Sequence, residues 1–347
     1  MNLTTKNVRE AVEILDDIIE EYNDETPKKK RDWRTYEQQL AQRIKTAVKD
    51  LEPLIIEAIS TIKFTKGDTR GRKQKLTLKQ KVELLLIKHL IEKSNREMSN
   101  MLVIFSLLSD IDVSYKSVER LYSDEGVHLV LINLHVLILK KKGVNDPDCS
   151  GDGTGYALTI KKHYASVAQK LKDKAKKNSG QKITKRSKKR SGKKTQFIYS
   201  FKMMDLDTRL YVGSGSSLKS EKEAYIKAVK MSEIVDMDSI RLDRYYSTQK
   251  DTKLLEDHFG KDIKIYVIPK KNATVKGSWK WKELLENFVT DTKGYLSEYY
   301  RRNQSESAFS EDKRRFGWRI AQRRPDRIDT HDFCTTLWHN MLWMGRN

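Results

Sequence analysis

The stretch QFIYSFKMMDLDTRLYVGSG, from Gln196 to Gly215, decides the fold class of this chain. Its two ends are rich in aromatic and other apolar residues, and the polar residues from Asp205 to Thr208 lie between them. That pattern predicts two strands joined by a turn. The earlier stretch TGYALTI, residues 154–160, has a similar composition and predicts a strand that precedes both.

Helices and strands alternate after this stretch. Two helices are expected at residues 220–234 and 247–259, and two strands, SIRLD and IKIYVI, at 239–243 and 263–268. Further helices follow. This succession predicts an α/β domain with a mixed sheet and helices on both faces. The order βββαβαβα is the order of the ribonuclease H-like fold.

Residues 1–63 have the periodicity of an N-terminal helical region. Apolar residues recur at helical spacing over residues 5–23, and a second helical stretch covers 34–62, where Pro53 is expected to bend or divide the helix. Residues 64–76 form a linker rich in Gly, Lys and Arg. Such a linker can follow a DNA groove as an extended arm or act as a solvated hinge.

Residues 77–143 predict an all-α helix-turn-helix domain that binds DNA. Thr77 and Gln80 fit a capping box that opens its first helix, a second helix is expected at 95–108, and Ser114 is the expected N-cap of a compact third helix. The same pattern also fits three helices that pack together without DNA. The side chains of the third helix that we expect to contact DNA are Tyr115, Lys116 and Arg120.

The charge of the chain indicates a polyanion as partner. The 347 residues carry a formal net charge of +21, and about fifteen Lys and Arg residues stand between Lys161 and Lys194 against a single Asp173. A core cannot absorb this density, so residues 161–194 are expected to project from the 144–347 domain as a basic arm that neutralises phosphates. A flexible solubilising loop is the alternative. The DNA contacts expected from the arm are Lys188, Lys189 and Arg190.

Cysteine content and hydropathy restrict the class of protein. Cys149 and Cys334 are too few for a disulfide framework, so a reducing interior is expected. The longest apolar run, VHLVLINLHVLIL, has 13 residues and is too short to span a bilayer. No membrane partner is therefore expected.

Two aspartates are expected at one edge of the sheet. Asp152, in SGDGTGYALT, has glycine on both sides and is expected at the mouth of the first strand, and Asp243 ends the strand SIRLD. Because the first and fourth strands are neighbours in this fold, the two carboxylates would repel each other, and a divalent cation is the usual remedy. Glu306, on a later helix, is a candidate third ligand. A turn at Asp152 and a helix cap at Asp243 are the simpler explanations.

Four residues around Glu306 have helical spacing. Tyr299, Arg302, Glu306 and Lys313 follow one another at gaps of three, four and seven residues, which places them on one face of a helix. This spacing matches the Y-(2)-R-(3)-E-(6)-K signature of a group of DDE transposases of prokaryotic insertion sequences, and GDGTGY and LDRYY resemble the two aspartate motifs of that group. The resemblance covers residues 148–338, and the helical N-terminal half is similar to these enzymes only in its general plan.

The resemblance implies an enzyme that binds double-stranded DNA at the terminal repeats of an insertion sequence, cleaves a strand there and transfers it to target DNA. Arg302 is then expected to brace the scissile or a neighbouring phosphate, Lys313 to reach another phosphate, and Tyr299 to stack or hydrogen-bond near the cut end. Two ends must be held together, so a homodimer is expected, in the cytoplasm of a prokaryote and associated with its nucleoid. Two Mg2+ ions, or Mn2+ as a substitute, are implied between the three carboxylates Asp152, Asp243 and Glu306.

Some alternatives stay open at this point. The stretch VNDPDCSG lacks the apolar strand that usually leads into the first aspartate, so Asp146 or Asp148 is an outside alternative to Asp152. Trp279 and Trp281 are candidates for stacking on a flipped base, as in some relatives, although core packing is the simpler use. The alternative functions are a catalytically inactive DNA-binding or architectural protein and a nuclease without strand transfer.

Overall fold

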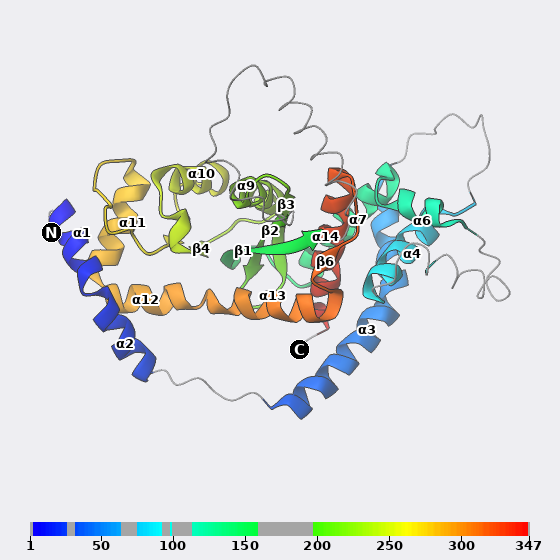
Figure 1. The fold of residues 1–347 in the computed structure, drawn as a ribbon, viewed down its shortest axis with the longest axis horizontal. Coiled ribbons are helices and arrows are strands. Elements are labelled where there is room, and N and C mark those ends of the chain that lie inside the picture. The colour runs from blue at the N-terminus through cyan, green and yellow to red at the C-terminus, as the bar shows by residue number, and fades with distance from the viewer. Residues whose placement is uncertain are drawn as a thin grey trace, which may run out of the picture.

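The second half of the chain folds as an open mixed sheet with helices on both sides (Figure 1). The computed structural model describes residues 3–25, 32–63, 75–91, 98, 113–158 and 197–345. The strands are β1 (Asp148–Leu158), β2 (Phe197–Asp205), β3 (Tyr211–Ser217), β4 (Ser239–Leu242), β5 (Lys264–Tyr266) and β6 (Arg319–Ile320). The α-helices are α1 (Thr5–Glu13), α2 (Leu15–Glu25), α3 (Trp33–Ser60), α4 (Leu78–Leu90), α6 (Tyr115–Leu121), α7 (Glu125–Lys141), α9 (Glu221–Met231), α10 (Gln249–Phe259), α11 (Trp279–Thr290), α12 (Thr292–Tyr300), α13 (Asn303–Phe316) and α14 (Pro325–Met344).

The strand order of the sheet is β3-β2-β1-β4-β5, and β6 pairs with β1. β1, β2 and β3 pair antiparallel, whereas β4 pairs parallel with both β1 and β5. This arrangement confirms the prediction of three successive strands followed by alternating helices and strands. The mixed open sheet with its helices is consistent with a ribonuclease H-like fold.

β1 begins earlier than the sequence indicated. The strand starts at Asp148, whereas the prediction began it at Thr154, so the expectation that Asp152 lies at the mouth of the strand is wrong. Polar and small residues build this first part of β1, and pairing with both β2 and β4 holds it. The parallel pairing with β4 ends at Gly151, which places Asp152 directly beyond the carboxyl end of that pairing.

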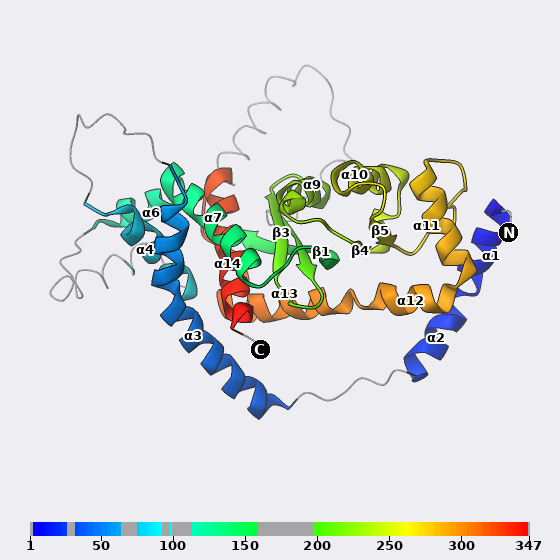
Figure 2. The same ribbon diagram turned by 180° about the vertical axis from the view of Figure 1, so that it is seen from behind.

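The two faces of the sheet differ in polarity, because successive residues of a strand point to opposite sides. On the face toward α9, glycines let the helix approach closely, and a Cβ at Gly215 would meet the carbonyl oxygen of Ala224. Figure 2 shows α12 and α13 running along the opposite side. Many residues of the second face that contact α12, α13 or α14 are polar, among them Asp148, Ser150, Ser200, Lys202, Ser214, Ser216 and Arg241. Apolar residues such as Ile198 and Met204 lie beside them and cluster with side chains of α14 and α13.

The N-terminal helices pack at opposite ends of the molecule (Figure 1). α1 and α2 contact α11 and α12, where apolar side chains of α1 and α2 join a cluster that contains Tyr299. α3 packs instead against α4, α7 and α14. It continues through Pro53, which does not divide it. The single helix expected over 5–23 is broken at Ile14, the residue between α1 and α2.

α4, α6 and α7 lie in the region where the helix-turn-helix is expected. Thr77 and Gln80 form the predicted capping box of α4, and Ser114 caps α6 as predicted. Most of the predicted second helix, 95–108, lies outside the described residues, so the helix-turn-helix stays a prediction. Most of the linker and the whole basic arm also lie outside them, including Lys188, Lys189 and Arg190.

α14 joins these helices to the sheet. Trp338 is buried and donates from Nε1 to the carbonyl oxygen of Leu86 in α4 at 2.8 Å, and Arg327 forms an ion pair with Glu119 of α6. In the part of the chain that the structure describes, none of the helices is long and apolar enough to cross a membrane.

A buried carboxylate links α13, α14 and β3. Asp312 is fully buried, accepts a hydrogen bond from Tyr211 Oη at 2.8 Å, and lies 2.9 Å from Nδ1 of His339. Although desolvation opposes its ionisation, the charge and hydrogen bond of His339, the charge of Lys202 and the hydrogen bond of Tyr211 lower the pKa of Asp312. Its contribution to stability is therefore present at neutral pH and is lost as the pH falls through this lowered pKa.

We expect Asp312→Ala to lower the free energy of unfolding by about 3–5 kcal/mol, because the substitution leaves buried partners without their carboxylate. Asp257→Ala removes an exposed ion pair with Lys253 and should change the free energy by less than about 1 kcal/mol. Urea unfolding at neutral pH measures both. An Asp312→Ala protein as stable as the control would contradict the assigned role.

Candidate active site

The site lies where β1 and β4 stop pairing. Gly151 and Leu242 are the last paired residues of these parallel strands, and Asp152 and Asp243 follow them directly. Each aspartate lies two residues beyond a polar residue, Ser150 or Arg241, whose side chain faces α12 or α13. Since side chains alternate along a strand, Asp152 and Asp243 point toward the same helices.

Asp152 is half-buried, and its surroundings disfavour its charge. Desolvation is the largest effect, and together with the charges of Glu306 and Asp243 it raises the pKa of Asp152 to about 6. The backbone N–H of Gly153, 2.8 Å from Oδ1, and the charge of Arg302 act in the opposite direction. These interactions bring the three predicted carboxylates and Arg302 into one electrostatic neighbourhood.

Asp243 has two roles at the end of β4. Its Oδ1 accepts a hydrogen bond from the backbone N–H of Tyr245 at 2.8 Å, which caps the short 3-10 helix Arg244–Tyr246. Its Oδ2 lies 3.6 Å from Nη2 of Arg302. The simpler reading of Asp243 as a helix cap is therefore correct, and the same side chain still faces the predicted site.

Arg302 is the cation between two of the carboxylates. The Nη2 atom that approaches Asp243 also lies 3.3 Å from Oε1 of Glu306. The guanidinium carbon lies 5.3 Å from the ring centre of Tyr299. Tyr299 is itself only 4% exposed, within the apolar cluster of α1, α11 and α12. Tyr299 thus packs beneath Arg302, and its contact with DNA stays a prediction.

The four residues of the signature do not lie on one regular helix. α12 ends at Tyr300 and α13 begins at Asn303. At the junction, the N–H of Arg302 bonds to the carbonyl oxygen of Tyr299, and that of Ser305 to the carbonyl oxygen of Arg302, which are three-residue steps. Such tight turns let two helices continue nearly in line, as Figures 1 and 2 show.

Lys313 lies further along α13, between two aromatic rings. Its Nζ is 5.3 Å from the ring centre of Tyr156 on β1 and 5.1 Å from that of Trp318. Burial, together with the charge of Lys202, lowers the pKa of Lys313. Trp318 is 60% exposed, so this lysine sits at the border of the molecular surface.

The donor atoms of the site suit a hard divalent cation, because all are carboxylate oxygens. Within the described residues, however, no three His, Cys, Asp or Glu side chains are arranged to hold a metal ion as they stand. Arg302 supplies the positive charge beside Asp243 and Glu306 instead. The chemistry of the donor atoms therefore fits such an ion, although these side chains are not arranged around one.

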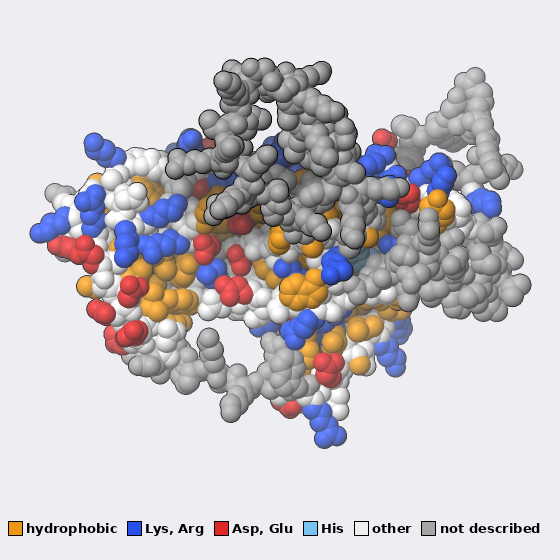
Figure 3. Space-filling view, viewed as in Figure 1, with side chains coloured by type: hydrophobic (Ala, Val, Ile, Leu, Met, Phe, Trp, Pro, Cys, Tyr) orange, Lys and Arg blue, Asp and Glu red, His pale blue; other side chains and the backbone are white. Residues whose placement is uncertain are grey.

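The remaining predicted residues lie elsewhere. Tyr115, Lys116 and Arg120 are exposed on α6, away from the carboxylates. Trp281 is buried and donates from Nε1 to the carbonyl oxygen of Thr274, which confirms core packing for this residue. Trp279 is exposed on α11, so core packing is wrong for it. Figure 3 shows Lys and Arg side chains over much of one face, with a group of acidic side chains near its centre.

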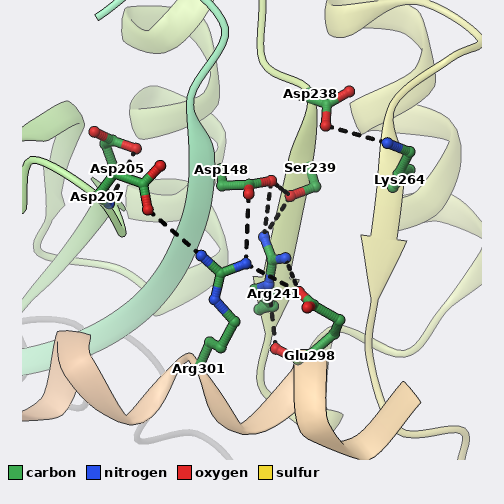
Figure 4. Close-up of polar contacts among 9 residues, drawn as sticks. All are labelled: Asp148, Asp205, Asp207, Asp238, Ser239, Arg241, Lys264, Glu298 and Arg301. Carbon is green, nitrogen blue, oxygen red and sulfur yellow. Dashed lines mark hydrogen bonds and ion pairs between the residues drawn. The ribbon is translucent and has the colours of Figure 1, made fainter. Parts of the chain in front are cut away.

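A second ionic cluster, which the sequence analysis missed, lies next to the site (Figure 4). It consists of Asp148, Arg241, Glu298 and Arg301, here called the quartet. Asp148, the outside alternative to Asp152, is therefore already paired with two arginines. The available signal was the alternation of polar residues in DCSGD and SIRLD, which puts the polar side chains of both strands on one face.

Comparison with known proteins identifies a relative that matches nearly the whole chain. The chain is 42% identical over 342 residues to the "Probable transposase for insertion sequence element ISA1214" of Archaeoglobus fulgidus. The match covers 98% of this chain and 96% of that protein. No family model matches the chain, and no solved structure matches it.

Proposed function

This chain belongs to the family of the ISA1214 insertion-sequence transposase, and from that premise we propose that it is a DDE transposase. It would bind the ends of its insertion sequence, cleave DNA there and join the freed strand to target DNA. The observation that supports this chemistry is the convergence of Asp152, Asp243 and Glu306 around Arg302. Double-stranded DNA is the substrate, held by a homodimer so that two ends meet.

Asp152, Asp243 and Glu306 are the residues that would hold two Mg2+ ions, or Mn2+ in their place. When bound, such a pair activates a water molecule and stabilises the leaving oxygen of a phosphodiester. The raised pKa of Asp152 is consistent with this use, because crowded, desolvated carboxylates favour a cation between them.

Arg302 and Lys313 are the residues that would bind DNA phosphates. A guanidinium forms paired hydrogen bonds with a phosphate as readily as with a carboxylate, so Arg302 can exchange Asp243 and Glu306 for the scissile or neighbouring phosphate. Lys313 lies about 10 Å from Glu306 along the helix and would reach a different phosphate. Tyr299 supports Arg302 from below.

Recognition of the ends is assigned to other segments. Tyr115, Lys116 and Arg120 on α6 would read base edges, and the basic arm at residues 161–194 would grip phosphates without regard to sequence. The short interface between α6 and α14, through Glu119 and Arg327, holds α6 against the sheet domain.

We expect Asp152→Asn, Asp243→Asn and Glu306→Gln each to reduce cleavage of the inverted repeats that flank the coding region by at least about 100-fold. The basis is that substituting even a residue that only orients a metal ligand typically lowers metal affinity or activity 10- to 100-fold. Binding of the repeats should be largely intact in a gel-shift assay.

Asp238→Asn is the matched control, because Asp238 precedes β4 at its other end and pairs with Lys264. It should cleave at the wild-type rate. Full activity in one of the three variants would remove that residue from the site. A wild-type protein that binds the repeats but cleaves with neither Mg2+ nor Mn2+ would instead be an inactive DNA-binding protein. Pre-cleaved ends that are never joined to target DNA would indicate a nuclease.

Arg302→Gln should bind Mn2+ about 5- to 10-fold more tightly than the wild type in the absence of DNA. The reason is that it removes a positive charge 3.3 Å from Glu306 and 3.6 Å from Asp243, worth about 1 kcal/mol in a watery environment. Titration followed by the electron spin resonance of free Mn2+ measures this. Arg314→Gln, on the exposed side of α13, is the control. Equal Mn2+ affinities in the two variants would refute the proposal that Arg302 competes with Mn2+ for the carboxylates.

Changing Lys188, Lys189 and Arg190 to glutamine should weaken binding to all DNA alike. The slope of log affinity against log salt should become shallower by about 0.9 for each phosphate that the arm no longer neutralises. Lys116→Ala or Arg120→Ala should instead erode discrimination between cognate and scrambled ends by about 1–3 kcal/mol. Fluorescence anisotropy across salt concentrations tests both, and loss of end preference in the arm variant would reverse the assigned roles.

A further inference from the structure

The quartet lies at the start of the two strands that carry the candidate site (Figure 4). Asp148 opens β1 four residues before Asp152, and Arg241 lies in β4 two residues before Asp243. Its other two members, Glu298 and Arg301, come from the end of α12. The quartet therefore joins both catalytic strands to the helix junction that leads to Glu306.

Arg241 is the centre of these contacts and is 2% exposed. Its Nε donates to the carbonyl oxygen of Glu298 at 3.2 Å, and its Nη2 pairs with the carboxylate of the same residue. Its Nη1 donates to Asp148 at 3.4 Å and to Ser239. The guanidinium also lies 4.9 Å from the ring centre of Tyr266 on β5. One buried side chain thus holds the last turn of α12 against three strands.

Arg301 closes the quartet from the helix side. Its Nη1 lies 3.4 Å from Oδ2 of Asp148 and 3.1 Å from Oε2 of Glu298. Both carboxylates are consequently shared by two arginines, and the quartet itself holds two charges of each sign. The exposed carboxylate of Asp207 adds a further ion pair, 3.6 Å from Nη2 of Arg301. Despite the opposing effect of desolvation, the hydrogen bond from Ser239 and the two arginines lower the pKa of Asp148, so the carboxylate is ionised at neutral pH.

At the junction between α12 and α13, the side chains of two consecutive arginines point to different clusters. Arg301 enters the quartet, while Arg302 points to Asp243 and Glu306. Ser150 makes a second set of contacts with the junction, between the quartet and the carboxylates of the candidate site. This residue of β1 donates to the carbonyl oxygen of Arg302 at 3.4 Å and contacts the hydroxyl of Ser305. The residue next to Ser305 is Glu306, so any shift of the junction moves this carboxylate.

We propose that Arg241 and Arg301 are positioning residues, which set the distance of Glu306 and Arg302 from Asp152 and Asp243 by fixing the α12–α13 junction on β1 and β4. They do not touch DNA or the reacting atoms themselves. This inference rests on the proposed function, because it concerns the geometry of the same carboxylates.

Two variants of different severity test the inference. Arg301→Gln loosens the quartet at its half-exposed member, and Arg241→Met removes its buried centre. Because a misplacement of about 1 Å can cost about 100-fold in rate, we expect kcat for cleavage to fall by about 10-fold in the first and about 100-fold in the second. KM for the repeats should change less than about 2-fold. Mn2+ affinity without DNA should fall about 10-fold, as for other groups that orient metal ligands.

Arg43→Met is the matched control for loss of a buried arginine. Arg43 is as enclosed as a core residue, with its guanidinium 4.6 Å from the ring centre of Trp343, and it contacts α13 through Glu311, beyond the α12–α13 junction. It should lower the melting temperature without changing Mn2+ affinity or kcat. Arg301→Lys keeps a cation between Asp148 and Glu298 and should recover most of the activity that Arg301→Gln loses.

The double variant Arg241→Met with Glu298→Gln separates positioning from stability. It leaves Asp148 paired with Arg301, so the quartet is balanced again and the melting temperature should rise above that of Arg241→Met. Cleavage should stay low, because Arg241 no longer holds α12 against β1 and β4. Recovery of cleavage together with stability, or wild-type Mn2+ affinity in folded Arg301→Gln and Arg241→Met, would overturn the inference. Absence of cleavage by the wild type would refute the proposed function alone, since Mn2+ affinity still reports on the carboxylates.

Discussion

The sheet face beneath α12, α13 and α14 carries many polar residues, and buried polar groups need partners. At the start of β1 and β4 two arginines face the two carboxylates of the quartet, and Arg301 also pairs with the exposed Asp207. Further along the same strands, Asp243 and Glu306 pair with the guanidinium of Arg302, and Asp152 lies near enough for their charges to affect its pKa. The same two strands therefore carry a neutral cluster at one end and an excess of negative charge at the other.

The sequence was sufficient for the order of strands and helices in the sheet domain. Strands β2 to β5 were recognised because their apolar residues alternate or run together, and Asp243 was placed correctly because it follows such a strand. The start of β1 was not recognised from the sequence, because DCSGD contains almost no apolar residues. Its strand character comes from pairing with β2 and β4, which are distant in the chain. β6, with two residues, was missed for the same reason.

Side-chain environments were harder to predict than elements. The spacing of the signature placed Tyr299 on the face of Arg302, and the two side chains do contact each other. It could not reveal that α1 and α2, almost three hundred residues earlier, would help bury the tyrosine. Likewise, the composition offered Asp148 as a rival to Asp152. In the structure the Asp148 carboxylate is shared by Arg241 and Arg301, an arrangement that the sequence did not reveal.

The signature spacing has a geometric explanation in how α13 lies along β1. Arg301 contacts Asp148, Ser305 contacts Ser150, and Lys313 lies over Tyr156, so helix and strand advance in the same direction. The helix rises about 1.5 Å per residue and the strand about 3.3 Å, so the step from Glu306 to Lys313 covers about 10 Å and the step from Asp152 to Tyr156 about 13 Å. Seven helical residues therefore cover somewhat less length than four strand residues, which still leaves Lys313 over Tyr156. Glu306 and Lys313 both lie within α13, so uninterrupted helix separates them, and a different interval would move the lysine away from Tyr156.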